Sequence, residues 1–308
     1  MTNYGVGRGG SGCGRRSTVS EQGDLFVAAV IDPPLRDNRD AMEHPFLSLQ
    51  KRRTRPITYA HNNIRIEVHA PEKFGIATIW DWDIIIGVAS QINDAIERGD
   101  PTSPRVSFAP YNLLKSIGRG TGGKDYRELA AAIRRLRMTT VITNVRSEDG
   151  AGLERPFSWV SDYAIPTKYT TILTPEAHDG EADPTRPWII ELPPWLYNAI
   201  TRRRDILAVH PGYFDLTSGI ARALYRMARK SVPESGVGVW NFRIETLHHR
   251  LGVSSSRREF ARALREIAAD NLMPEYVIHI AKVHGHETVT MIRDRGKPPR
   301  PRRGIYRP

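Results

Sequence analysis

Residues 241–294 constrain the fold of this chain most, because their pattern predicts two short helices followed by two strands. The apolar residues of the first helix recur at near-helical spacing: Phe242, Ile244, Leu247 and Leu251. Gly252 ends that helix, and the serines at positions 254–256 can cap the start of a second one. A short and well-marked turn therefore separates two helices.

The second helix has two distinct faces. At about 100° per residue, three apolar positions fall within about 60° of Phe260: Ala263, Leu264 and Ile267. Three basic positions fall about 140° to 200° away from it: Arg258, Arg262 and Arg265. One face can therefore pack on the preceding helix while three guanidinium groups point outward, although an ordinary surface helix with solvated arginines has the same pattern.

After this helix, residues 276–280 and 288–292 alternate as strands do, and residues 283–287 between them have turn chemistry. Helix, turn, basic helix, strand, loop, strand is the order of a winged helix, whose second helix enters the major groove of DNA. The candidate DNA contacts of this segment are Ser255, Ser256, Arg257, Arg258, Arg262, Arg265, Lys282, His284 and His286. The three arginines of the outward face are expected to read bases, and Arg257, at the helix start, to hold a phosphate.

The composition indicates a basic, mostly globular protein of about two domains. The 308 residues are 40% hydrophobic and 26% charged, with a formal net charge of +11, and the sequence pI is about 9.9. This charge predicts nucleic acid as the partner, and no apolar run approaches the roughly 18 residues of a membrane span. Cys13 is the only cysteine, which excludes an intrachain disulfide and a Cys-rich zinc site. No apolar export signal is visible, so we expect a cytoplasmic location.

The same order of elements recurs earlier in the chain. Residues 81–163 predict helix, strand, two helices around a Gly-rich turn, and strands at 139–145 and 157–163. Three positions match between the copies at one constant offset: Leu113 with Leu247, Gly118 with Gly252, and Tyr126 with Phe260. The predicted fold class is therefore α+β, with two winged-helix domains in tandem and extra strands on the first, among them 168–173 and 187–192.

These patterns divide the chain into four parts. The Gly-, Ser- and Arg-rich residues 1–23 are expected to be a disordered tail. Residues 24–192 are expected to form the first winged-helix domain and residues 193–294 the second. Residues 295–308 form a basic, Pro-rich tail that we expect to add non-specific phosphate contacts.

The first copy has a weaker DNA signature than the second. Its candidate contacts are Arg119, Lys124, Arg127, Arg134 and Arg135. We expect its second helix to expose Lys124 and Arg135, with Glu128 between them, and to hold Arg127 and Arg134 on its flank. The second copy, which has three arginines on one face, is therefore predicted to be the better DNA reader.

Two motifs resemble catalytic sites and are rejected as such. Residues 118–124 match most of a phosphate-binding loop, but Asp125 stands where a Mg²⁺-binding Ser or Thr is needed, and the stretch follows a helix instead of a strand. His284 and His286 flank a glycine at a loop tip, where contact with phosphate is a simpler role than metal binding. No catalytic residue, metal or cofactor is predicted.

Five short motifs, in order, resemble the plasmid replication initiator protein A family over about residues 24–293: Asp24-Leu25-Phe26, Met42-Glu43-His44-Pro45-Phe46, Gly75-Ile76-Ala77-Thr78-Ile79, Trp195-Leu196-Tyr197-Asn198-Ala199-Ile200 and His210-Pro211-Gly212-Tyr213-Phe214. The resemblance implies a tandem winged-helix initiator without enzymatic activity. Such a protein binds repeated sites in double-stranded origin DNA, helps to open the duplex, and recruits the host initiator and helicase. Whether the active form is a monomer or a homodimer stays open.

Two other classes of function compete with an origin-binding initiator. A transcriptional regulator of its own operon would have the same fold, but tandem unequal DNA readers without a ligand-binding domain favour the initiator. A replication enzyme, either a nicking nuclease or an ATPase, would need the catalytic patterns rejected above. DNA is therefore the expected partner, with no role for a membrane.

Overall fold

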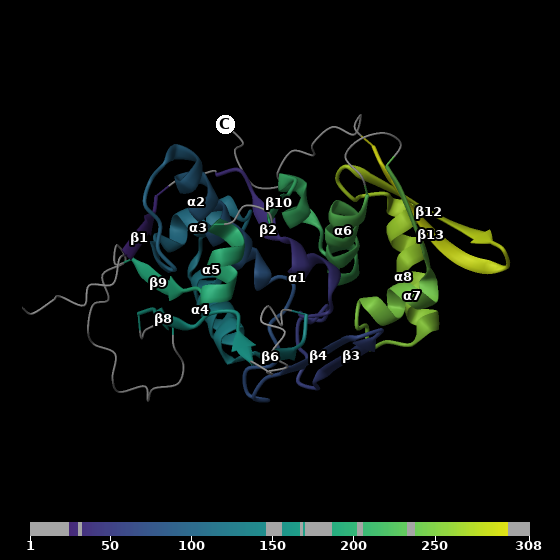
Figure 1. Ribbon diagram of the computed structural model, residues 1–308, viewed down its shortest axis with the longest axis horizontal. Coiled ribbons are helices and arrows are strands. Elements are labelled where there is room, and N and C mark those ends of the chain that lie inside the picture. Colours follow the sequence, from purple (N-terminus) through teal and green to yellow (C-terminus); the bar gives the residue numbers. More distant parts are fainter. Residues whose placement is uncertain are drawn as a thin grey trace, which may run out of the picture.

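The C-terminal part of the chain has the order of elements that the sequence predicts. The computed structural model describes residues 25–29, 33–145, 156–166, 169, 187–201, 206–232 and 238–294. The elements of this part, in chain order, are α6 (Gly219–Ser231), β11 (Val239–Arg243), α7 (Ile244–Arg250), α8 (Arg257–Asp270), β12 (Tyr276–Val283) and β13 (His286–Arg293). The strands form one antiparallel sheet in the order β11-β13-β12, and the hairpin β12–β13 projects from one end of the molecule (Figure 1).

Local chemistry fixes the turn between α7 and α8, as predicted. Gly252 follows α7 with a φ angle of 58°, a left-handed conformation that glycine adopts without strain. Ser256 caps α8: its hydroxyl accepts a hydrogen bond from the Glu259 N–H, and the Glu259 carboxylate accepts one from the Ser256 N–H at 2.9 Å. The start of α8 is thus held in a defined position.

The preceding part of the chain repeats this arrangement. Its elements are α2 (Trp82–Arg98), β5 (Arg105–Phe108), α3 (Pro110–Ser116), α4 (Gly123–Met138), β6 (Thr140–Thr143), β7 (Phe157–Ser158), β8 (Asp162–Ala164) and β9 (Trp188–Glu191). β5, α3 and α4 begin at Arg105, Pro110 and Gly123, and β11, α7 and α8 begin at Val239, Ile244 and Arg257. The offset that relates Leu113 to Leu247 therefore also relates the starts of three pairs of elements.

The strands after α4 differ from the prediction. The predicted strands 139–145 and 157–163 do not form one full hairpin. β6 pairs with β7 at only two positions and pairs with β4 along its other edge. The second predicted strand is divided into β7 and β8, which belong to different sheets. Trp159 and Val160, adjacent in sequence, are both buried, so one alternating strand cannot run through them. β8 and β9 take the place of the hairpin, and the order β5-β9-β8 matches β11-β13-β12.

The N-terminal segment joins the two repeats. β1 (Leu25–Ala28) pairs with β5, β2 (Arg36–Asn38) pairs with β10 (Ile206–Ala208), and α1 (Arg39–Glu43) packs on α6. β3 (Ile57–His61) and β4 (Ile64–His69) extend a sheet with β6 and β7 that runs beneath α7 (Figure 1). Between the repeats lie α5 (Pro194–Thr201) and the 3₁₀ helix η2 (Pro211–Asp215). The boundary at 192/193 stays a prediction.

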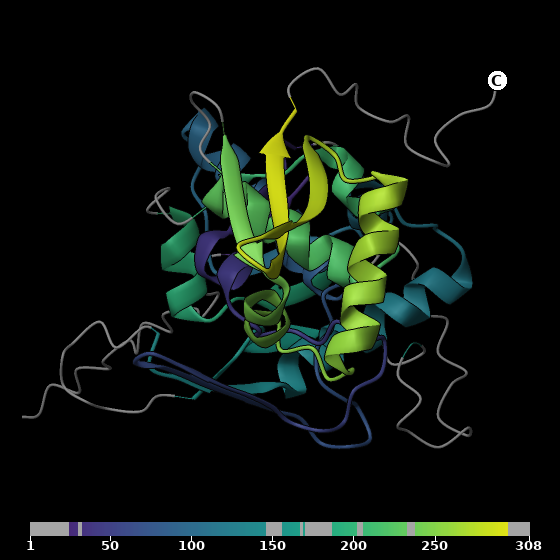
Figure 2. The same cartoon turned by 90° about the vertical axis from the view of Figure 1, so that its right-hand side faces the viewer.

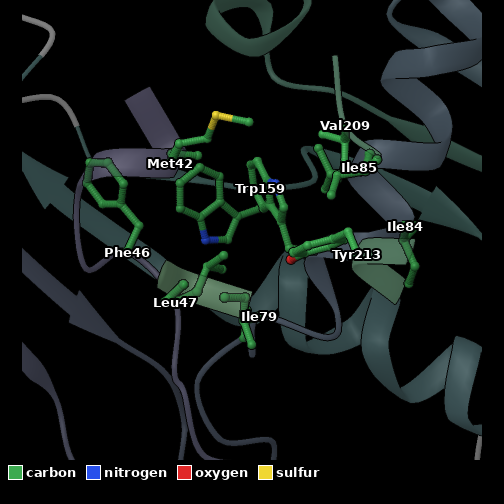
Figure 3. Close-up of a cluster of buried hydrophobic side chains, with 14 of the residues drawn as sticks. Met42, Phe46, Leu47, Ile79, Ile84, Ile85, Trp159, Val209 and Tyr213 are labelled. Carbon is green, nitrogen blue, oxygen red and sulfur yellow. The ribbon is translucent and has the colours of Figure 1, made fainter. Parts of the chain in front are cut away.

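The core is continuous across these parts. Trp159 is almost fully buried, with its ring centroid 5.6 Å from that of Phe46 and 4.7 Å from that of Trp82. Figure 3 shows it among side chains from α1, α2 and the segment that leads into η2, including Met42, Ile85 and Val209. The protein is thus a mixed α and β fold, as predicted.

Some predictions concern residues that are not described: the tails at 1–23 and 295–308, and the strand at 168–173 apart from Tyr169. The strand predicted at 187–192 is present as β9. No helix in the described part of the chain is long and apolar enough to cross a membrane.

Candidate nucleic-acid interface

Helix α8 presents the two faces that its sequence predicts. Phe260 and Leu264 have no exposed surface, and the Phe260 ring lies 5.3 Å from the ring of His248 on α7. The three arginines of the other face are exposed: Arg258, Arg262 and Arg265. The same residues that anchor α8 to α7 therefore direct three guanidinium groups away from the core.

A basic hollow of about 410 Å³ lies between the start of α7, the exposed side of α8 and the tip of the β12–β13 hairpin. The charged side chains that line it are Arg243, Arg257, Arg258, Arg265, Glu245, Glu287 and, when protonated, His286. In Figure 2 the yellow hairpin stands beside the yellow-green α8, with α7 seen end-on. Elements from separate parts of the repeat thus enclose one concave surface.

Two carboxylates hold arginines of this hollow in place. The Arg265 Nη2 atom lies 2.6 Å from Glu287 Oε1 on β13, and Arg257 pairs with Glu245 on α7. Each of these four side chains is at least 38% exposed, so water screens both pairs and they contribute little to stability. Phosphate or base oxygens can therefore replace the carboxylates. Periodicity did not reveal Arg243, Glu245 or Glu287, because the fold alone brings them to α8.

The hairpin tip is tighter than the predicted loop of residues 283–287. Val283 pairs with His286, and the two residues between them, His284 and Gly285, have φ angles of 50° and 81°. Positive φ at both positions is the geometry of a two-residue type I′ turn. Lys282, His284 and His286 are exposed at this tip, as a DNA contact requires. No cluster of three or more metal-ligating side chains occurs among the described residues.

Three of the five candidate contacts of the first copy are engaged inside the protein. Arg134 is buried and donates a hydrogen bond to the Tyr169 carbonyl at 2.7 Å. The prediction that Arg135 is freely exposed is wrong, since its guanidinium donates two hydrogen bonds to the Asp81 carboxylate at 2.8 and 2.7 Å. Arg119 donates to the Trp80 carbonyl and lies 3.2 Å from Asp83.

The constant offset between the repeats explains this outcome. The positions of Arg258, Arg262 and Arg265 on α8 correspond to Lys124, Glu128 and Ala131 on α4, whereas Arg134 and Arg135 correspond to two alanines, Ala268 and Ala269. The outward face of α4 thus has one positive, one negative and one neutral side chain. Lys124 and Arg127 remain exposed near its start.

The Gly-rich loop before α4 has no room for a phosphate. The Asp125 carboxylate turns back into the loop and accepts a hydrogen bond from the Gly122 N–H at 2.9 Å. A Cβ atom at Gly120 would lie 2.7 Å from the same carboxylate, which shows how closely the loop wraps around it. A negative charge therefore occupies the space that a phosphate-binding loop leaves for its anion. The loop acts as the turn between α3 and α4.

The chain is similar to proteins of DNA replication. Residues 36–278 match the replication initiator protein A family. A protein of Wigglesworthia glossinidia brevipalpis named "Putative replication protein" is 30% identical over 259 residues, which are 83% of this chain and 88% of that protein. A crystal structure of selenomethionine derivatives of RctB domains 2 and 3 aligns at 14% identity with a TM-score of 0.58, over 83% of this chain and 98% of that one. A second structure of RctB domains 2-3 aligns at 11% identity with a TM-score of 0.55, over 83% and 97%. At such identities the likeness to RctB concerns the fold.

Proposed function

Because the chain belongs to the replication initiator protein A family, we propose that it initiates replication of a plasmid by binding repeated sites in double-stranded origin DNA. The observation that carries the proposal is the exposed arginine face of α8 beside the hairpin β12–β13. A helix-turn-helix whose second helix is basic on its outer face places that helix in the major groove of DNA.

Both repeats are proposed to be winged helices in tandem. In the second repeat α7 and α8 are the helix-turn-helix, and the hairpin β12–β13 is the wing. In the first repeat α3, α4 and the strands β8 and β9 have the same order and sheet arrangement. The poorer charge of α4 favours a division of labour in which α8 reads the sequence and α4 contributes phosphate contacts through Lys124 and Arg127.

Arginine is suited both to reading bases and to binding phosphates. A guanidinium that points into the major groove can donate two hydrogen bonds to the O6 and N7 atoms of one guanine. Arg258, Arg262 and Arg265 are proposed for this role. Arg257 lies at the N-terminus of α8 next to the capping Ser256, where a helix favours an anion, and it is proposed to hold a phosphate together with Ser255 and the wing tip. No catalytic step is part of this function.

We further propose that the protein helps to open the origin duplex and recruits the host initiator and helicase. Its proposed location is the cytoplasm. The alternative function is regulation of the protein's own operon. DNase footprinting on the DNA that flanks the gene separates the two: an initiator protects several direct repeats, and a regulator protects one inverted repeat. Absence of any protected site, with folded protein, would exclude both.

We expect the affinity for duplex DNA to depend steeply on salt. Basic residues are spread over both repeats, and each neutralised phosphate contributes a slope of about −0.9 to the logarithm of the association constant against the logarithm of salt concentration. The predicted slope is steeper than about −5. Fluorescence anisotropy with a labelled repeat, over a salt series, measures it. A slope near −1 would contradict an interface dominated by phosphate contacts.

We expect the variant Arg262→Ala to relax specificity at one base position. Loss of a bidentate contact to guanine removes about 1–3 kcal/mol of discrimination. Competition binding with single-base variants of the protected repeat measures this. The matched control is Arg98→Ala. Arg98 is an exposed arginine on α2, across the molecule from α8 (Figure 1), and its replacement should not change the specificity or the affinity for DNA. If Arg262→Ala weakens binding to every variant by the same factor, α8 contacts the phosphate backbone of the DNA and another part of the protein reads the bases.

A further inference from the structure

A basic segment of the N-terminal part, residues 51–55, lies against the turn between α7 and α8. Arg53 makes the connection: its Nη1 atom donates to the Gly252 carbonyl in that turn at 3.0 Å. Its Nε and Nη2 atoms donate to the carbonyls of Arg55 and Pro56 at 3.1 and 3.0 Å. One guanidinium therefore ties the segment before β3 to the helix-turn-helix, 199 residues further along the chain.

The packing around this connection is close on both sides. A Cβ atom at Gly252 would lie 2.7 Å from Pro45 and 3.4 Å from Ile57, so the turn packs directly on the chain before the segment and on the start of β3 after it. Further along β3, the Tyr59 ring lies 5.0 Å from the His249 ring on α7. The segment and α7 therefore keep a fixed relation to each other.

The other basic residues of the segment face solvent. Lys51, Arg52 and Arg55 are exposed, and no described carboxylate forms an ion pair with any of them. Three positive charges are thus presented beside the helix-turn-helix without local compensation. Arg53 is not available to an external phosphate in the same way, because its guanidinium donates to three carbonyls.

We propose that Lys51, Arg52 and Arg55 bind phosphates of the same DNA duplex that α8 reads, and that Arg53 positions them. This inference rests on the proposed function. In a helix-turn-helix complex the first helix crosses the DNA backbone, so a segment packed against α7 and its following turn lies along the continuing phosphates. Such contacts carry no sequence information and strengthen binding to all sequences alike.

The test compares full-length K51Q/R52Q/R55Q with wild type on two labelled duplexes, the protected repeat and a scrambled sequence of equal length. We expect the affinity for both to fall by the same factor, about tenfold or more at 0.1 M salt, and the salt slope to become shallower by about 2 to 3. The matched control is R98Q/R105Q/R137Q, which removes three exposed charges from the first repeat. An unchanged slope in the first triple variant, or equal changes in both, would overturn the proposal.

Arg53 is tested through its coupling to these residues. Arg53→Lys keeps the charge but cannot donate to three carbonyls in the same geometry. We expect it to weaken DNA binding in the wild-type background and to have little effect in K51Q/R52Q/R55Q, because the residues that it positions are then gone. An equal loss in both backgrounds would mean that Arg53 only supports the fold.

These outcomes are separate from a failure of the proposed function. If wild type binds the repeat no better than the scrambled duplex, sequence-specific origin binding is wrong. If wild type discriminates and Arg262→Ala reduces the discrimination, but K51Q/R52Q/R55Q behaves like wild type, only the role of the basic segment is wrong.

Discussion

Replacing Arg222 with alanine is expected to lower the free energy of unfolding by about 3–5 kcal/mol, because it breaks a buried ion pair on one side only. The Arg222 side chain is 4% exposed, and its Nη1 atom lies 2.6 Å from Asp83 Oδ1. Its other nitrogens donate to the carbonyls of Leu216 and Phe214 at 2.7 and 2.9 Å. Alanine would leave a buried carboxylate whose one remaining ion-pair partner among the described residues is the partly exposed Arg119, and two carbonyls without the Arg222 donor.

Urea unfolding followed by circular dichroism measures this change. Arg98→Ala removes the ion pairs of Arg98 with Asp94 and Asp100, in which Arg98 is 47% exposed, and it should lower the free energy of unfolding by less than about 1 kcal/mol. A loss for Arg222→Ala as small as that of the control would contradict the assignment. The double replacement Arg222→Met with Asp83→Leu is expected to recover part of the loss, since no buried carboxylate is left without its partner. Arg119 then loses Asp83, but its side chain is partly exposed and still donates to the Trp80 carbonyl.

Buried pairs of this kind join the two repeats. Asp83 lies on α2 of the first repeat and Arg222 on α6 of the second. Asp37 on β2 accepts from Arg226 on α6 at 2.6 Å and from the Trp82 indole on α2 at 2.6 Å. Any rotation of one repeat against the other must therefore break charged contacts that are shielded from water. We expect the two repeats to present their proposed DNA-binding faces at a fixed spacing.

The parts of the fold that sequence could predict are those fixed by neighbours along the chain. Helical spacing of apolar residues predicted α7 and α8, Gly252 predicted the turn, and the serines at 254–256 predicted the cap that Ser256 forms. Phe242 was wrongly assigned to the first helix, because it lies in β11 opposite Val289 and α7 begins at Ile244. The offset between the repeats held because both use a left-handed glycine, Gly118 or Gly252, at the same place. These features depend on interactions between residues within about one helical turn of each other, which a linear pattern contains.

Other features depend on partners that are distant in sequence. Arg135 looks like an exposed contact until Asp81, 54 residues away, is brought next to it. Residues 157–163 resemble one strand until Trp159 turns into the shared core and separates β7, which pairs with β6, from β8, which pairs with β9. Likewise, Glu287 joins the candidate interface only because the hairpin packs on α8, and Arg243 only because β11 ends at the start of α7. The spacing of residues along the chain does not indicate such contacts. The arginine face of α8 was therefore predictable, and the carboxylates that pair with it were not.

Replacing Phe260 with alanine is expected to lower the free energy of unfolding by about 3–5 kcal/mol, because the ring is fully buried and its loss leaves a cavity between α7 and α8. Phe260 shares the core with Leu247 and Leu251, which are also buried, and its ring contacts His248. The Nε2 atom of His248 lies 2.7 Å from the Ser255 carbonyl, so the cavity would border the turn that holds the start of α8.

Thermal melting measures the effect, and DNA binding measured well below the melting temperature shows its consequence for recognition. The matched comparison is Tyr126→Ala, since Tyr126 occupies the equivalent position in α4 but is only partly buried, and it should lose less stability. Arg262→Ala should leave the melting temperature unchanged while it relaxes specificity, because Arg262 is 75% exposed. Phe260→Ala should have the opposite pattern. Its melting temperature should be lower and its DNA binding weaker, but its preference among the base variants should be unchanged. An unchanged melting temperature for Phe260→Ala would mean that the apolar and basic faces of α8 are inverted.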